Sequence, residues 1–387
     1  MGTFLAVDGR APIHAFYSSK SWIEGNAVQQ LETIARLPGI TAVAAMPDLH
    51  SGKYGPVGCS ILAEHIHPPF VGSDIGCGMG LFQLDVAVRK VRADKAAERL
   101  RVLGTPWDGD IVPRLDRHGL ASTPYDVALG SIGGGNHFCE LQAIEEIVAP
   151  ELAAEARINR ECAFVLVHSG SRGLGYAILQ RQLAQGAPAL DPHADAGRDY
   201  LTAHGAAVRW ASLNRQVIAE RAAAAVRADC RRIADLSHNM VEVGEAGVLH
   251  RKGTAPADRG LVPIPGSRGT LSYLVAPLAA DRPEALASLA HGAGRKFDRA
   301  SMHGRLRTGK ADRARLARNP FGGVVVCEDR DLLVEEAPDA YKNIDRVITD
   351  LVDFGLVRVV ATFRPLVTFK TAGGAAKAQR REKEDRR

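Results

Sequence analysis

Residues 72–80, GSDIGCGMG, place a carboxylate and a thiol three positions apart on a glycine-rich backbone. Asp74 and Cys77 are residue types that bind metal ions, and glycine lets a chain turn tightly or approach a ligand closely. A tight turn with a buried cysteine and a capping aspartate would give the same pattern. The stretch therefore indicates a metal site only if other loops present suitable partners.

Five histidines adjoin glycine, asparagine or serine in loop-like settings, and they are His50, His137, His168, His238 and His291. A single histidine of this kind is usually a surface or hydrogen-bonded residue. Three imidazoles together with Asp74 and Cys77 can form two adjoining metal sites with the sulfur between the ions. Two ions about 3.5–4 Å apart would stabilise both the attacking and the leaving oxygen of a phosphoryl transfer. Thiolate and imidazole favour zinc, and the spacing leaves manganese and iron open.

Three further glycine-rich stretches, 133–138, 263–272 and 291–296, can surround an anion with backbone N–H groups. Asn136 and Asn239 each stand beside a histidine, where an amide can hold an oxygen. Each stretch alone is compatible with an ordinary turn. Together they favour phosphate or nucleotide binding near the histidines.

The elements that must position these loops are of mixed type. Strand-like runs occupy 163–169, 322–329 and 357–369, and helical patterns occupy 89–104, 205–235, 283–290 and 339–353. Strands and helices do not alternate regularly, which excludes a doubly wound sheet. The sequence predicts one α+β domain over 1–369 and a basic C-terminal tail over 370–387.

Composition indicates a globular protein of the cytoplasm. The 387 residues are 46% hydrophobic and 24% charged, and no apolar run approaches the ~18 residues of a membrane span. The N-terminus lacks a secretory signal pattern, and six scattered cysteines fit a reducing compartment. Most of the net charge of +5 comes from the tail, whose usual interpretation is solvated disorder.

The motifs also occur in a family-like order. PDLHSGKYGPVG, GSDIGCG, GGGNHFCE, HSGSRGLG, SHNMVE, HRKG, PGSRGT, HGAGR and EEAPDAYKNID span about residues 40–369, and this series resembles RtcB, the GTP-dependent RNA ligases. The resemblance implies mixed or antiparallel sheets flanked by helices around a central metal and GTP cleft. It also implies an enzyme of RNA repair or tRNA processing that joins RNA 3′-phosphate or 2′,3′-cyclic phosphate ends to 5′-hydroxyl ends.

The resemblance assigns roles to particular residues. Two manganese ions would be bound by Asp74, Cys77, His137, His168 and His238, with Cys77 bridging them. His291 would form a covalent GMP-histidine intermediate, and Asp48 would orient its ring. Contacts to GTP would come from Asn136, His137, Phe138, Cys139, Glu140, His238, Asn239, Pro265, Gly266, Ser267, Arg268, Ser272, His291, Gly292, Ala293, Gly294 and Lys342.

Two other functions share the metal-binding residues. A two-metal phosphodiesterase or phosphatase acting on RNA ends would need the ions without GTP, and an inactive relative would bind RNA alone. The stretches HGAGR and PGSRGT and Lys342 favour the ligase, because a hydrolase needs no guanine pocket and no nucleophilic histidine. No membrane partner is expected, and the resemblance leaves room for an activating protein.

Some residues depart from the family pattern or suggest contacts with RNA. Arg268 stands where many members carry methionine, and an added cation there would lie beside the nucleotide. The region 104–130 is short for the family. Candidate contacts to RNA phosphates are Arg172, Arg251, Lys252, Arg268 and Arg295.

Overall fold

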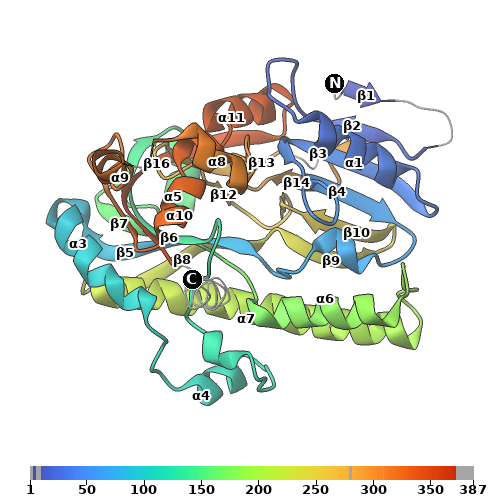
Figure 1. Cartoon of the computed structure of the whole chain (residues 1–387), viewed down its shortest axis with the longest axis horizontal. Helices are drawn as coiled ribbons and strands as arrows, with labels where there is room; N and C mark the ends of the chain where they lie inside the picture. Colours follow the sequence, from blue (N-terminus) through green and yellow to red (C-terminus); the bar gives the residue numbers. More distant parts are fainter. Residues whose placement is uncertain (1–2, 6–9, 279–280, 308, 372–387) are drawn as a thin grey trace.

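The computed structural model describes residues 3–5, 10–278, 281–307 and 309–371 (Figure 1). Within these residues the strands form a six-stranded sheet, an eight-stranded sheet and a two-stranded sheet. Helices lie against the sheets, so the predicted α+β class with mixed sheets is confirmed. No helix in the described ranges combines the length and apolar character that a membrane span requires.

The six-stranded sheet has the order β1-β2-β3-β4-β10-β9. Its strands β2 and β3 pair in parallel, and the other neighbours are antiparallel. The bounds are β1 Thr3–Leu5, β2 Ile13–Ala15, β3 Ile40–His50, β4 Val57–Ala63, β9 Asn239–Gly244 and β10 Gly247–Lys252.

The eight-stranded sheet has the order β12-β13-β16-β6-β7-β5-β8, and β15 pairs in parallel with β16. Its bounds are β5 Gly78–Ala87, β6 Phe138–Ile147, β7 Cys162–Ser169, β8 Cys230–Ser237, β12 Val262–Ile264, β13 Ser272–Pro277, β15 Val324–Cys327 and β16 Val357–Lys370. The two-stranded sheet pairs β11 Thr254–Pro256 with β14 Ser288–Ala290.

The α-helices vary from one turn to 31 residues. Their bounds are α1 Gly25–Ala35, α2 Pro68–Val71, α3 Ala93–Leu100, α4 Ile111–Asp116, α5 Pro150–Glu155, α6 Gly173–Gln185, α7 Asp195–Ala225, α8 Arg299–Arg305, α9 Lys310–Leu316, α10 Arg330–Glu335 and α11 Ile344–Asp353. The long helix α7 packs across β5, β7 and β8, and it runs along the lower side of the molecule in Figure 1.

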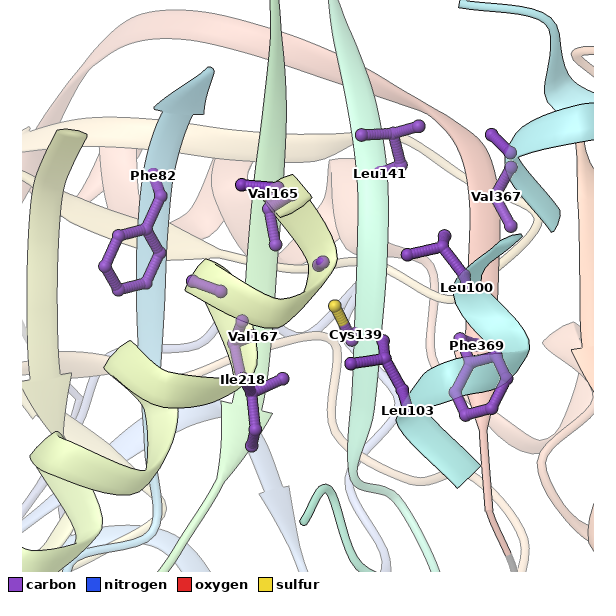
Figure 2. Close-up of a cluster of buried hydrophobic side chains, with 14 of the residues drawn as sticks. Phe82, Leu100, Leu103, Cys139, Leu141, Val165, Val167, Ile218, Val367 and Phe369 are labelled. Carbon is purple, nitrogen blue, oxygen red and sulfur yellow. The ribbon is translucent and has the colours of Figure 1, made fainter. Parts of the chain in front are cut away.

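Strand β7 lies between β6 and β5 in the interior of the eight-stranded sheet, and its residues are buried on both faces. Val165 and Val167 point toward α7 and pack with Ile218, as Figure 2 shows. Phe164 and Leu166 point to the opposite face and join a separate apolar cluster. Successive side chains alternate between faces, so a continuous apolar run is what a strand covered on both sides requires.

One predicted helix has different bounds in the structure, and another was wrong. The pattern at 205–235 begins earlier, as α7, and gives way to β8; Arg227 between them has a φ of 61°, which no helix continues through. The run at 283–290 is a single 3-10 turn followed by β14, because Leu286 and Ala287 also have positive φ. The helices near 89–104 and 339–353 and the strands near 163–169, 322–329 and 357–369 were confirmed in kind.

Candidate active site

The candidate metal ligands come from the ends of four neighbouring strands. Asp74 and Cys77 immediately precede β5, His137 precedes β6, His168 lies near the end of β7, and His238 follows β8. These strands are adjacent in the order β6-β7-β5-β8, and the His238 backbone N–H donates to the Cys77 carbonyl at 2.7 Å. The sheet therefore brings together, at one end of these strands, side chains that lie far apart in the sequence.

The ligand atoms converge on the Cys77 sulfur. Cys77 Sγ lies 3.1 Å from His168 Nε2 and 3.4 Å from His137 Nε2, and Asp74 Oδ2 lies 2.9 Å from His137 Nε2. Two ligand groups result, Cys77 with His168 and His238, and Cys77 with Asp74 and His137, each with its atoms within 4.8 Å. Both groups share the thiol, which is the arrangement that a bridging sulfur requires.

The charge states of the cluster suit a cation. Burial lowers the pKa of His168 and of His238 well below the usual value, and neighbouring histidines add to this effect, so both rings are neutral at pH 7. Burial also raises the pKa of Cys77 well above that of a free thiol, and the Asp74 carboxylate raises it further. A metal ion would supply the positive charge that stabilises the thiolate, and neutral imidazole is the form that binds metals.

The Asp74 carboxylate offers a second sign of fit. Burial opposes its ionisation, yet its pKa is lowered overall because His137 and Arg172 lie beside it. Its Oδ1 atom is buried without a hydrogen-bond partner, which is costly unless a ligand satisfies it. The carboxylate also needs Gly170 opposite it, since a Cβ on that residue would lie 2.3 Å from Oδ1.

A second pair, Asp48 and His291, lies beside this cluster. Asp48 is on β3, and His291 directly follows β14. Asp48 Oδ2 accepts hydrogen bonds from His291 Nδ1 at 2.6 Å and from the His291 backbone N–H at 3.1 Å. Because the carboxylate is an acceptor, the ring proton sits on Nδ1 and the lone pair on Nε2. The pair is buried, with Asp48 0% and His291 8% exposed.

Close backbone approach makes the pair possible. Gly294, with a φ of 70°, lies so near β3 that a Cβ would be 2.2 Å from the Asp48 carbonyl oxygen. The His291 ring lies against His238, with centroids 4.6 Å apart and an interplanar angle of 58°. The structure thus brings the candidate nucleophile into contact with a candidate metal ligand.

A cavity of about 930 Å³ opens over both groups. It is lined by the predicted metal ligands, by His291 and by every predicted nucleotide residue except Cys139, Ser272 and Lys342. Its volume is in the range of small-molecule and nucleotide sites. The glycine-rich stretches at 265–268 and 291–294 form part of its wall.

The three exceptions lie behind the cavity wall. Cys139 belongs to the apolar cluster under α7, and Ser272 accepts a hydrogen bond from Gln142 at 3.0 Å. The Lys342 ammonium donates to the carbonyl oxygens of Pro47 and Leu49, which flank Asp48. In this structure Lys342 therefore braces the strand that carries the candidate orienting acid.

The cationic residues that the sequence suggested as RNA contacts have different partners in the structure. Arg268 lines the cavity, but its guanidinium donates to the carbonyls of Leu333 and Glu336 at 2.7 and 2.9 Å, so it ties the loop to α10. Arg251 is buried and bonds Glu242 and Ser288. Arg172 donates to His137 Nδ1 at 3.3 Å.

Sequence reasoning missed the carboxylate that organises a cationic wall. Glu336 is 2% exposed, and its oxygens lie 3.0 Å from Arg295, 3.2 Å from Arg299 and 3.6 Å from Lys370. All four residues line the cavity. Lys370, which the sequence assigned to the tail, is the last residue of β16 and donates to the His137 carbonyl at 3.0 Å. The lack of an alternating pattern beyond Phe369 concealed it.

Glu140 is a second buried acid in the wall. Burial raises its pKa to about 7, although Thr368, Gln142 and Lys370 stabilise the ionised form. The Thr368 hydroxyl and the Gln142 amide both donate to it. A carboxyl group with a pKa near 7 can accept a hydrogen bond from a polar ligand when ionised and can donate one when protonated.

Known proteins resemble the chain over nearly its full length. A family model described as tRNA-splicing ligase RtcB matches residues 30–103 and 118–371. RNA-splicing ligase RtcB2 of Escherichia coli is 44% identical over 363 residues, which cover 92% of this chain and 95% of that protein. RNA-splicing ligase RtcB of Mycobacterium tuberculosis is 30% identical over 436 residues, covering 87% and 99%. tRNA-splicing ligase RtcB of Archaeoglobus fulgidus is 28% identical over 463 residues, covering 92% and 94%.

Proposed function

The chain belongs to the RtcB family and is an RNA ligase, and we propose that it joins RNA 3′-phosphate or 2′,3′-cyclic phosphate ends to 5′-hydroxyl ends through a guanylylated His291. The energy would come from GTP, and the work would be RNA repair or splicing in the cytoplasm. No observation favours the alternative of an RNA-end phosphatase.

The observation that carries the proposal is the buried pair of Asp48 and His291 beside the metal cluster. A neutral imidazole is a competent nucleophile at pH 7, and a carboxylate on its far nitrogen fixes the tautomer. The 2.6 Å contact between Asp48 Oδ2 and His291 Nδ1 leaves Nε2 with the lone pair. A two-metal hydrolase that uses metal-activated water needs no nucleophilic histidine, whereas the ligase needs one at the cavity, and His291 lines it.

In the first proposed step, His291 Nε2 attacks the α-phosphorus of GTP. A P–N bond forms, the P–O bond to the β-phosphate breaks, and pyrophosphate leaves with the electron pair. The ring gains positive charge, while its Nδ1–H stays hydrogen-bonded to the Asp48 carboxyl group, which stabilises that charge. The backbone N–H bond to the same carboxylate keeps the ring in place.

In the second step, an oxygen of the RNA 3′-phosphate attacks the GMP phosphorus. The P–N bond breaks, His291 recovers its lone pair, and the RNA end carries a diphosphate linkage to guanosine. The oxygen of the RNA 5′-hydroxyl then attacks the 3′-phosphorus and loses its proton to water. The P–O bond to GMP breaks, GMP leaves with the electron pair, and a phosphodiester remains. Arg295, Arg299 and Lys370 line the same cavity and would hold these phosphates.

The residues fit a metal-dependent ligase. Asp74, Cys77 and His137 would hold one ion, and Cys77, His168 and His238 the other, which we propose to be manganese on the family resemblance. When bound, such ions neutralise phosphoryl oxygens and activate water, including the water that opens a cyclic phosphate. For the guanosine, Phe138, Glu140 and the 265–268 loop line the adjoining wall.

A ligation assay tests the proposal. Two short RNAs, one ending in a 3′-phosphate and one beginning with a 5′-hydroxyl, are incubated with the protein, manganese and GTP, and products are separated on a denaturing gel. We expect a joined product that requires both GTP and the 3′-phosphate. Removal of the 3′-phosphate without joining, at equal rates with and without GTP, would instead indicate a hydrolase.

A further inference from the structure

An exposed tryptophan stands at the mouth of the catalytic cavity. Trp22 is 41% exposed, lines the cavity, and lies before the segment that the family model matches, which begins at residue 30. A large apolar ring that is partly open to solvent beside a polar cavity is available for contact with a ligand. Nothing in the chemistry proposed for His291 uses it.

The loop that carries Trp22 is anchored on both sides. Before it, the Ser18 backbone N–H donates to Asp350 Oδ2 at 3.2 Å, and the Ser21 hydroxyl bonds the same oxygen. After it, Glu24 accepts hydrogen bonds from the backbone N–H and the hydroxyl of Ser51. The exposed ring is therefore held at the mouth by fixed neighbours.

Trp22 faces a second aromatic ring with cations beside it. The centroids of Trp22 and Phe297 lie 6.4 Å apart at an interplanar angle of 59°, and Phe297 also lines the cavity. The Arg305 guanidinium carbon is 3.7 Å from the Phe297 centroid, and the Lys296 ammonium is 5.2 Å from it. Both cationic residues are exposed and line the same cavity.

Aromatic faces beside cations are the chemistry that binds single-stranded nucleic acid. Unpaired bases stack on aromatic rings, and Lys or Arg neutralise the neighbouring phosphates. The tilt between Trp22 and Phe297 leaves them short of a parallel stack with each other. His291 is 8% exposed and Trp22 41%, so Trp22 is more open to solvent than the histidine that would react.

We propose that Trp22 and Phe297 form a stacking rim for the nucleobase at the 3′-end of the RNA. The inference rests on the proposed function, because a 3′-phosphate that reaches guanylylated His291 leaves its own nucleobase nearer the mouth. Lys296 and Arg305 then neutralise the phosphate on the 5′ side of that last nucleotide. The rim favours single-stranded ends, since an unpaired terminal base can offer both faces for stacking, whereas a base pair at a duplex end offers only one.

The test is a thermodynamic cycle that combines a protein variant with a modified RNA. Binding of a fluorescent 3′-phosphate RNA is measured by anisotropy for the wild type, Trp22→Ala and Trp22→Phe. A second RNA lacks the base of its last nucleotide. Tyr176→Ala is the control, because Tyr176 is 56% exposed but does not line the cavity.

We expect Trp22→Ala to weaken binding of the intact RNA about 5- to 100-fold and Trp22→Phe to restore most of it. The abasic RNA should bind the wild type weakly and should lose almost nothing further with Trp22→Ala. Intact RNA that binds Trp22→Ala as tightly as the wild type would overturn the proposal. Equal losses with intact and abasic RNA would overturn it too.

Labelling with α-labelled GTP separates this rim from the guanine site. Guanylylation involves no RNA, so we expect Trp22→Ala to take up label at the wild-type rate and GTP dependence. A weakened GTP dependence in Trp22→Ala with unchanged RNA binding would assign the rim to guanine and overturn the RNA assignment. A wild type that takes no label would contradict the guanylylation mechanism, while the binding cycle would still decide the stacking.

Discussion

The surroundings of Glu336 allow us to predict how much this residue contributes to the free energy of unfolding. Its carboxylate is buried among Arg295, Arg299 and Lys370, and the Tyr341 hydroxyl donates to it. Although burial opposes ionisation, these neighbours lower its pKa from 4.5 to about 2. At about 1.4 kcal/mol per unit of pKa, the ionised form stabilises the fold by about 3 kcal/mol relative to a free carboxylate. Breaking a buried ion pair costs a similar ~3–5 kcal/mol.

We therefore expect Glu336→Gln to lower the free energy of unfolding at pH 7 by about 3 kcal/mol. The matched control is Glu335→Gln on the preceding residue, whose carboxylate is 23% exposed and contacts His303 at 3.3 Å. A partly exposed pair of this kind contributes ~0–1 kcal/mol. Denaturant unfolding followed by circular dichroism measures both variants against the wild type.

The pH dependence has a definite sign. The pKa of Glu336 is lowered in the folded state, so its contribution is complete above pH 4.5 and is lost as the pH falls toward about 2. The stability gap between the wild type and Glu336→Gln should stay constant from pH 7 to pH 5 and narrow below pH 4.5. A gap at pH 7 no larger than that of Glu335→Gln would refute the reasoning.

Three other substitutions test the site. Asp48→Asn removes a charge-assisted hydrogen bond, and single-turnover labelling with α-labelled GTP should slow about 10- to 100-fold; an unchanged rate would reduce Asp48 to a structural role. Cys77→Ala should lower the manganese bound per chain from two ions to at most one, as measured by mass spectrometry, whereas Cys59→Ala, another buried thiol, should retain two. Gly170→Ala forces a Cβ against the metal-site carboxylate and should weaken manganese binding at least about tenfold by titration calorimetry. The control Gly25→Ala, whose added Cβ would meet open space, should leave manganese affinity unchanged. Equal manganese affinities of Gly170→Ala and the wild type would contradict the predicted steric clash.

Sequence patterns singled out most residues of the candidate site because these residues sit in short glycine-rich loops at strand ends. Asp74, Cys77 and His168 could be singled out by residue type and setting, and the resemblance then gave them roles. What brings them together is the strand order β6-β7-β5-β8, a long-range property that local patterns do not encode. The structure places the ligand atoms of each group within 4.8 Å.

Residues without a local sequence pattern were not predicted from the sequence. Trp22 belongs to no motif, and its position at the cavity depends on Asp350, far away in the chain. Lys370 resembled the start of the basic tail, although it extends β16 and points to Glu336. The boundary between α7 and β8 depends on the positive φ of Arg227, and the sequence has no glycine at this position to indicate it. Long-range packing decided each case.

The central claim is that His291 carries GMP, and labelling tests it most directly. Purified protein is incubated with α-labelled GTP and manganese and run on a denaturing gel beside His291→Ala and the control His303→Ala, whose side chain is 40% exposed. The account predicts an acid-labile, alkali-stable label on the wild type and on His303→Ala and none on His291→Ala. The absence of label on all three, with phosphate still released from RNA 3′-ends, would contradict the ligase mechanism.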